Sequence, residues 1–264
     1  MSHFGLPQYI DQLIGHGSYT FQKDDALKAL GITQNAFHQS LLHLRKAQRV
    51  TRIANNFYGV IPQELRFSGG LPPTWVIDSL MSFYNLPYYI GILSAAAIHG
   101  ASHQSIQELQ VVTTKPLRTL SFGNARIRFF VNRRIEKVAT EKMKVQTGFM
   151  IISTPEATAF DLLAYPKAAS HLNNITTVLA ELAPKLDERR LLKLADDELE
   201  HAILQRLGYL LDTWSEEKPT AALYKWLSKK HTQFVYLSPQ SSKQILERDD
   251  KWKIYINEEI EPDL

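Results

Sequence analysis

Amide and basic side chains gather on one face of a predicted helix. In residues 34–47 the apolar side chains of Phe37, Leu41 and Leu44 recur at helical spacing. At about 100° per residue, the opposite face carries Asn35, Gln39, His43 and Lys46, with His38 on one flank. Asn and Gln amides can pair with an adenine edge, and basic side chains can reach guanine or phosphate. The candidate DNA-contacting residues of this helix are Gln34, Asn35, His38, Gln39 and Lys46. A solvated amphipathic helix has the same pattern, so this segment alone does not decide between the two.

The neighbouring segments favour DNA binding. Helices are predicted over residues 6–14 and 23–30; the second ends at Gly31, and Thr33 stands where the N-cap of the next helix belongs. Two β-prone runs, residues 50–54 and 57–61, follow and are joined by Asn55-Asn56, which tolerate a tight hairpin turn. Helix, turn, helix and hairpin together predict a winged helix-turn-helix. Its hairpin would bring Arg49, Arg52, Asn55 and Asn56 to backbone phosphates or the adjacent groove.

Proline and glycine then mark a change in the chain. Pro62, Ser68-Gly69-Gly70 and Pro72-Pro73 crowd one short stretch, which is typical of a linker. We therefore predict an α+β protein with a winged helix-turn-helix DNA-binding domain at residues 1–66 and a larger mixed α/β domain at residues 67–264. The 264 residues and the 44% apolar composition allow a sizeable core in the second part.

Charge is distributed unevenly along the chain. Residues 1–66 hold seven basic and four acidic residues, whereas residues 115–146 hold nine basic and two acidic ones. The second region contains four candidate DNA-binding arginines, Arg126, Arg128, Arg133 and Arg134. Arg126 and Arg128 alternate along a predicted strand and so share one face, where phosphate or an acidic partner could dock. A solvated strand pair explains the same charges equally well.

The second part is predicted from local periodicity. Strands are expected at 109–113, 126–131 and 148–153, all three buried, and a closing strand at 252–256. Helices are expected at 75–83 and 88–100, and over 168–211 with interruptions at Pro184 and Gly208. Thr154-Pro155-Glu156 is a helix start, in which Glu156 is assigned a capping and dipole role.

Enzyme motifs are absent from the sequence. It has no GxSxG, no GK[ST] phosphate loop, no HExxH and no GxGxxG. The absence of cysteine excludes thiolate metal sites and a cysteine nucleophile. His99 and His103 are four residues apart, but no third ligand is evident, so no metal or other cofactor is expected. A loose set of Asp78, Glu108 and Glu141-Lys142 keeps a metal-dependent nuclease as an alternative, and toxin modification by the C-terminal part is another.

Three stretches resemble a known family. The stretches are LPYYIGILSAAAIHGASHQSIQELQVVTTKPLR, RIRFF and ISTPEATAFDLLAYPKAASHLNNITTVLAELA. The C-terminal sequence WKIYINEEIEPDL is also similar to the C-terminus of that family. They resemble the AbiEi antitoxins of type IV toxin-antitoxin systems. The resemblance implies an N-terminal winged helix that binds inverted repeats at its own promoter, with DNA-reading positions at Asn35, His38, Gln39 and Arg52. It also implies a C-terminal antitoxin domain and a cognate AbiEii-type nucleotidyltransferase toxin as partner.

No secretory signal and no membrane span is apparent in the sequence, which predicts a cytoplasmic protein. The modest charge of residues 1–66 leaves a protein-interaction adaptor as an alternative to a DNA-binding protein. Salt-sensitive affinity for DNA distinguishes the two.

Overall fold

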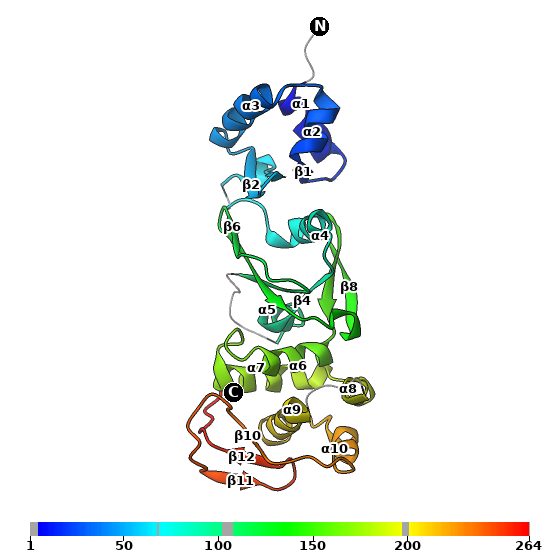
Figure 1. Cartoon of the computed structure of the whole chain (residues 1–264), viewed down its shortest axis with the longest axis vertical. Helices are drawn as coiled ribbons and strands as arrows, with labels where there is room; N and C mark the ends of the chain where they lie inside the picture. Colours follow the sequence, from blue (N-terminus) through cyan, green and yellow to red (C-terminus); the bar gives the residue numbers. More distant parts are fainter. Residues whose placement is uncertain (1–4, 68, 102–107, 197–200, 264) are drawn as a thin grey trace. The chain divides into compact units, whose positions relative to one another are not determined.

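The protein is a mixed α/β chain with helices and several sheets (Figure 1). The computed structural model describes residues 5–67, 69–101, 108–196 and 201–263. Its helices are α1 (Leu6–Gly15), α2 (Lys23–Leu30), α3 (Gln34–Lys46), α4 (Pro73–Tyr84), α5 (Ile92–Ile98), α6 (Pro155–Ala164), α7 (His171–Leu182), α8 (Glu188–Asp196), α9 (His201–Trp214) and α10 (Ala221–Leu227). Its strands are β1 (Thr20–Gln22), β2 (Val50–Ala54), β3 (Phe57–Val60), β4 (Tyr88–Ile90), β5 (Leu109–Thr113), β6 (Leu120–Phe122), β7 (Ala125–Val131), β8 (Thr140–Val145), β9 (Gly148–Ser153), β10 (Val235–Tyr236), β11 (Glu247–Asp249) and β12 (Ile254–Ile256). Short 3-10 turns are η1 (Gln63–Leu65), η2 (Ile135–Lys137) and η3 (Ala183–Lys185).

The chain divides into two compact units. Unit 1 comprises Met1–Tyr89, Gln107–Ile135 and Lys142–Ile151, and unit 2 comprises Ile90–Ile106, Glu136–Glu141 and Ile152–Leu264. The boundary predicted near residue 66 therefore lies within unit 1. As a division between a DNA-binding part and an antitoxin part, that boundary stays a prediction.

The first elements of unit 1 follow local sequence signals, and the predicted helices and hairpin are present. Gly31 is the C-cap of helix α2, and its φ of 61° lies in the left-handed region that glycine adopts without strain. Thr33 is the N-cap of helix α3, and its Oγ1 accepts the N–H of Ala36 at 3.2 Å. The hairpin turn places Asn56 at a φ of 60°. The strands form an antiparallel sheet of order β1-β3-β2.

A single core joins these elements. It contains the buried side chains of Leu6, Ile10, Phe21, Ala26, Phe37, Leu41, Leu44, Val50, Tyr58 and Val60. Aromatic contacts connect it to α4: the rings of Tyr19 and Trp75 are 4.9 Å apart, and those of Phe57 and Phe83 are 5.1 Å apart. Unit 1 is thus packed continuously from its first helix to α4.

The larger sheet has the order β6-β7-β5-β4-β9-β8. Strands β5 and β7 are parallel, as are β4 and β9, whereas β6 and β7 are antiparallel. All five residues of β5 are buried, as predicted. In β7 only Ile127 is buried, and in β9 the first two residues are exposed, so the expectation of three fully buried strands is wrong for these two.

The helix predicted over residues 88–100 is shorter than expected. Residues 88–90 form strand β4, and α5 begins only at Ile92. The β-prone sequence Tyr-Tyr-Ile pairs in the sheet, where Ile90 lies opposite Ile152. Tertiary pairing therefore overrides the apolar run that indicated one continuous helix.

Helix α6 is the central helix of unit 2. Seven of its ten residues are buried, and it packs against α5, α7, α8 and α9 (Figure 1). The predicted N-cap is confirmed, because Thr154 Oγ1 accepts the N–H of Ala157. The interruption predicted at Gly208 is wrong: this glycine lies inside α9, and its missing side chain makes room for the indole of Trp252.

The C-terminal residues of unit 2 form a small sheet of order β10-β12-β11. The predicted closing strand is present as β12, preceded by the buried Trp252. Gln205 of α9 donates to the carbonyls of Trp252 at 2.9 Å and Gln233 at 3.0 Å, which fixes this segment on the helix. Asp212 of α9 accepts the indole N–H of Trp252 at 2.8 Å.

Candidate nucleic-acid interface

Helix α3 presents a polar face to solvent. Its buried side is formed by Phe37, Leu41 and Leu44, as the spacing predicts. Its predicted contact residues are all exposed, namely Gln34, Asn35, His38, Gln39 and Lys46. The amide oxygen of Gln34 accepts from Lys23 Nζ at 3.4 Å, so this residue is partly engaged with α2. The structure therefore brings the other four together on one exposed face.

Two residues of this face were missed by the sequence analysis. Arg45 is exposed and has no hydrogen bond or ion pair from its guanidinium to a described residue, so its charge is available to a phosphate. Leu42 is 38% exposed between the turns that carry His38 and Lys46. The sequence signal for Leu42 is its position opposite the apolar stripe of Phe37, Leu41 and Leu44. A large aliphatic side chain at that position exposes apolar surface to water.

The hairpin holds Arg52 close to its tip. Arg52 Nη2 donates to Asn55 Oδ1 at 3.1 Å, and Arg52 Nε donates to the carbonyl of Ala54 at 3.4 Å. The β2–β3 register shifts between Arg52 and Ala54, which bends the strand at this point. Arg52, Asn55 and Asn56 are all exposed. They form one polar group at the hairpin tip.

Arg49 is placed differently from the expectation. Its guanidinium Nη2 lies 2.5 Å from Asp11 Oδ1 of α1, and its side chain is 24% exposed. This ion pair neutralises much of its charge within the protein. A phosphate contact by Arg49 would require the side chain to leave Asp11.

The arginines of the second basic region fall into two pairs. Arg126 and Arg128 both lie 3.4 Å from carboxylate oxygens of Glu108, which lowers the net charge of that strand face. Arg128 also lies over the ring of Phe130, with its Cζ 5.1 Å from the centroid. Arg133 and Arg134 are exposed in the turn after β7, and neither forms an ion pair with a described residue. The second pair is thus the more available to an anionic partner.

Two members of the loose acidic set considered for a nuclease, Asp78 and Glu108, are engaged in structural contacts. Asp78 accepts the hydroxyl of Tyr88 at 3.1 Å, and Glu108 pairs with arginines. Burial, followed by the charge of Asp78, raises the pKa of Tyr88, so its hydroxyl stays protonated and donates. His99 Nε2 lies 2.8 Å from the carbonyl of Ser153, and His103 lies outside the described residues. Within the described ranges no three His, Asp or Glu residues gather as a metal site.

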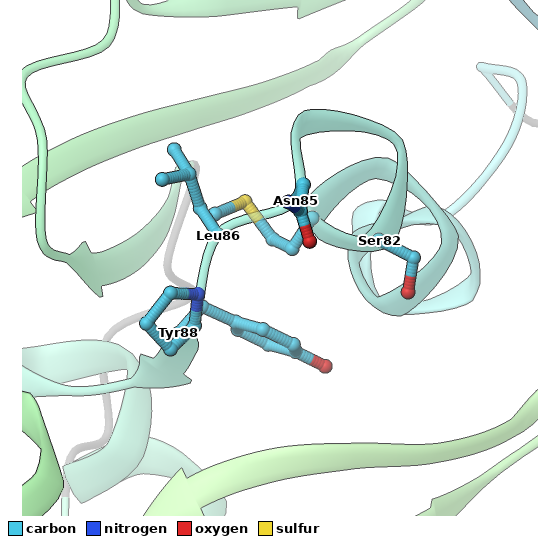
Figure 2. Close-up of a pocket in the computed structure, with 6 residues that line it drawn as sticks. Ser82, Asn85, Leu86 and Tyr88 are labelled. Carbon is cyan, nitrogen blue, oxygen red and sulfur yellow. The ribbon is translucent and has the colours of Figure 1, made fainter.

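A cavity of about 310 Å³ lies in unit 1 at the end of α4. Figure 2 shows Ser82 on the last turn of α4, Asn85 at the C-cap of that helix, Leu86 on the segment that follows, and Tyr88 at the start of β4. Met81 and Pro87 complete the lining, in which no Asp, Glu, His, Lys or Arg takes part. Ser82 therefore has no general base beside it in this cavity, and nucleophilic catalysis gains no support from it.

Residues 89–213 match the family model described as the AbiEi antitoxin C-terminal domain. This part of the chain belongs to the AbiEi antitoxin family. The AbiEi domain begins within β4 and ends within α9, so it includes the STPEATAFDLL motif and the buried helix α6. Helices α1–α4 with the hairpin, and the C-terminal sheet, lie outside the matched residues.

Solved structures extend the likeness to the fold of most of the chain. The RV2827C protein from Mycobacterium tuberculosis matches 94% of this chain and 89% of its own, with a TM-score of 0.67 and 16% identity. At this identity the likeness shows the fold alone. An antigenic nucleotidyltransferase-like protein from Paracoccidioides brasiliensis matches 57% of this chain and 94% of its own at 12% identity. Its TM-score of 0.31 is too low to indicate a shared fold. No curated protein matches the chain. In the described part of the chain, no helix combines the length and apolar character that crossing a membrane requires.

Proposed function

We propose that the protein is an antitoxin that also represses its own promoter. In this proposal residues 5–61 form a winged helix-turn-helix that binds duplex DNA, and the AbiEi domain counteracts a cognate nucleotidyltransferase toxin without catalysis of its own. The antitoxin part is supported by the family match over residues 89–213. The DNA-binding part is supported above all by the exposed polar face of α3, which stands beside an exposed hairpin carrying Arg52.

The order of elements supports this assignment. Helices α2 and α3 are joined by the turn at Gly31, and the hairpin β2–β3 follows directly. This is the connectivity of a winged helix-turn-helix, in which the second helix of the motif enters the major groove. A helix N-terminus free of acidic residues faces a phosphate backbone favourably, and the first turn of α3 contains none.

The side chains divide into roles by their chemistry. Asn35 and Gln39 are suited to an adenine edge, and Leu42 to the methyl group of thymine. Arg45 and Lys46 at the end of α3 are suited to phosphate or guanine. Arg52, Asn55 and Asn56 would contact the backbone or the neighbouring groove. Two copies of the protein on symmetric half-sites would place two such helices on an inverted repeat.

The first prediction concerns affinity for a duplex from the region upstream of the protein's own gene. Arg52→Ala is expected to weaken binding about fivefold on every sequence and to lower the salt slope of log K by about one, because one phosphate contact is lost. Gln39→Ala is expected to lower discrimination against a scrambled duplex by about 1–3 kcal/mol, because base readout is lost. Fluorescence anisotropy across a salt series measures both. Arg189→Ala, an exposed arginine of α8, is the control and should change neither.

The same titration tests the remaining hypotheses. The double variant Arg133→Ala/Arg134→Ala should lower the salt slope if the second basic region touches the duplex; an unchanged slope confines contact to residues 5–61. Wild-type protein with no salt-sensitive affinity for either duplex would support the protein-interaction adaptor and defeat the regulator proposal.

A second prediction concerns the antitoxin role. Full-length protein, expressed from a foreign promoter, is expected to restore growth to cells that produce the nucleotidyltransferase encoded beside its own gene. The double variant Lys46→Ala/Arg52→Ala should restore growth equally, because both residues lie outside the AbiEi domain. Growth inhibition that persists at equal expression of wild-type protein would refute the antitoxin role.

A further inference from the structure

A cavity of about 430 Å³ lies in unit 2, at the N-terminal end of α6. One wall is formed by the chain from η2 into β8, another by the first turn of α6, and a third by α8. The N–H of Thr154 donates to the carbonyl of Ala139 at 3.0 Å and so ties the first two walls together. The lining residues are Lys137, Val138, Ala139, Thr140, Glu141, Thr154, Glu156, Arg190, Lys193 and Leu194. Ligand cavities commonly have this size.

Glu156 is the most unusual residue of this lining. It is only 1% exposed, and its Oε1 accepts the N–H of Asp187 at 2.9 Å, just before α8. Glu156 therefore supports the start of α8 in addition to lying in the first turn of its own helix, where the sequence predicts a dipole role. Its Oε2 is buried and receives no hydrogen bond from any described residue. A buried carboxylate oxygen without a donor is costly, so a hydrogen-bond donor at this point would be strongly favoured.

Cations surround the same cavity. Arg190 and Lys193 project from α8 at a spacing of three residues, which places them on one side of the helix. Both are exposed, and neither forms an ion pair with a described residue. Lys137 contributes a third positive charge from the opposite wall, where Glu141 is the acidic neighbour. The site thus combines two available cations with a buried acceptor.

We propose that this cavity binds a nucleoside phosphate. Arg190 and Lys193 would hold its phosphate groups, and an N–H or O–H of its base or sugar would donate to Glu156 Oε2. Val138 and Leu194 offer apolar surface to the flat base. Inorganic phosphate has neither a flat body nor enough donors to satisfy both ends of the site. This inference is independent of the DNA-binding proposal, since none of its residues lies in residues 5–61.

Calorimetric titration of the full-length protein, without DNA, tests the proposal. The probes are ATP, GTP, CTP, UTP and inorganic triphosphate. At least one nucleotide is expected to bind saturably and more tightly than triphosphate. Arg190→Ala and Lys193→Ala should each weaken that binding at least about tenfold. Arg189→Ala removes the same charge from the adjacent position outside the lining and should leave it unchanged.

Glu156→Gln distinguishes the two ends of the site. Gln retains an acceptor for the N–H of Asp187 but replaces the other oxygen with a donor, so nucleotide binding should fall about tenfold while triphosphate binding stays the same. The proposal is overturned if no nucleotide binds at about 5 mM, if triphosphate binds as tightly as every nucleotide, or if the Glu156 or α8 variants bind like wild type. The two exposed α8 positions keep the test decisive if Glu156→Gln fails to fold.

Discussion

Gly208→Ala is expected to lower the free energy of unfolding of unit 2 by about 3 kcal/mol. Gly208 lies in the interior of α9, where alanine would ordinarily stabilise a helix by about 1 kcal/mol. Here a Cβ would overlap three ring atoms of Trp252, namely Cε3, Cζ3 and Cη2. The indole is 2% exposed and cannot move into solvent without emptying the core beside β12. Overpacking therefore outweighs the gain in helix propensity.

Urea denaturation monitored by tryptophan fluorescence measures this effect. The matched control is Gly15→Ala at the end of α1, because nothing lies within 4 Å of the added Cβ there. It should be neutral or slightly stabilising. In the double variant with Trp252→Ala, the cost of Gly208→Ala should largely disappear, since the two residues are in contact. Equal costs in the presence and absence of the indole would show that another contact is responsible.

Asp212→Asn is expected to destabilise the protein by about 2 kcal/mol at neutral pH. The carboxylate of Asp212 accepts from Lys251 Nζ at 2.5 Å, from Trp252 Nε1 at 2.8 Å and from Thr220 Oγ1. An amide provides only one acceptor oxygen and no charge, so at least one of these donors loses its partner. The control is Asp250→Asn, whose side chain is 74% exposed and pairs with Arg248 on the surface, and which should cost less than about 1 kcal/mol.

The pH dependence of this effect has a defined sign. Burial raises the pKa of Asp212, but the hydrogen bonds from Lys251, Thr220 and Trp252 outweigh it and bring the pKa below its ordinary value. A carboxyl with a depressed pKa stabilises the folded state above its unfolded pKa of about 3.9, and this contribution is lost as pH falls through the folded value. The difference in stability between wild type and Asp212→Asn should be constant from neutral pH to about pH 5 and shrink below about pH 4. A difference that stays constant to pH 2 would contradict the charge-based account.

Local signals predicted the first 61 residues well. Thr33, Gly31 and the Asn55-Asn56 turn each act within a few residues of their own position, and the structure has a cap, a helix end and a hairpin at these places. The exposed face of α3 likewise follows from a spacing within one helix. Such features depend on the chain's immediate neighbourhood and can be read without knowledge of the fold.

The remaining features depend on contacts between distant residues. Asp11 neutralises Arg49 from 38 positions away, and Glu156 supports α8 from 31 positions away. The glycine at 208 resembles a helix breaker until Trp252 is known to lie against it. Ile90 joins a sheet because Ile152 lies opposite, although the sequence around it resembles a helix. None of these pairs carries a short-range sequence signal.

The ring contacts of Tyr19 with Trp75 and of Phe57 with Phe83 have a consequence for the proposed binding to an operator. Helix α3, the proposed DNA-reading helix, shares a core with the β1-β3-β2 sheet, and that sheet region is fixed against α4 by these ring contacts. In such an arrangement α3 cannot change its orientation on the duplex independently of α4. If two copies of the protein bind one inverted repeat, moving its half-sites apart by a fraction of a helical turn would misalign one copy of α3 with its groove. Neither copy could correct this by moving α3 alone.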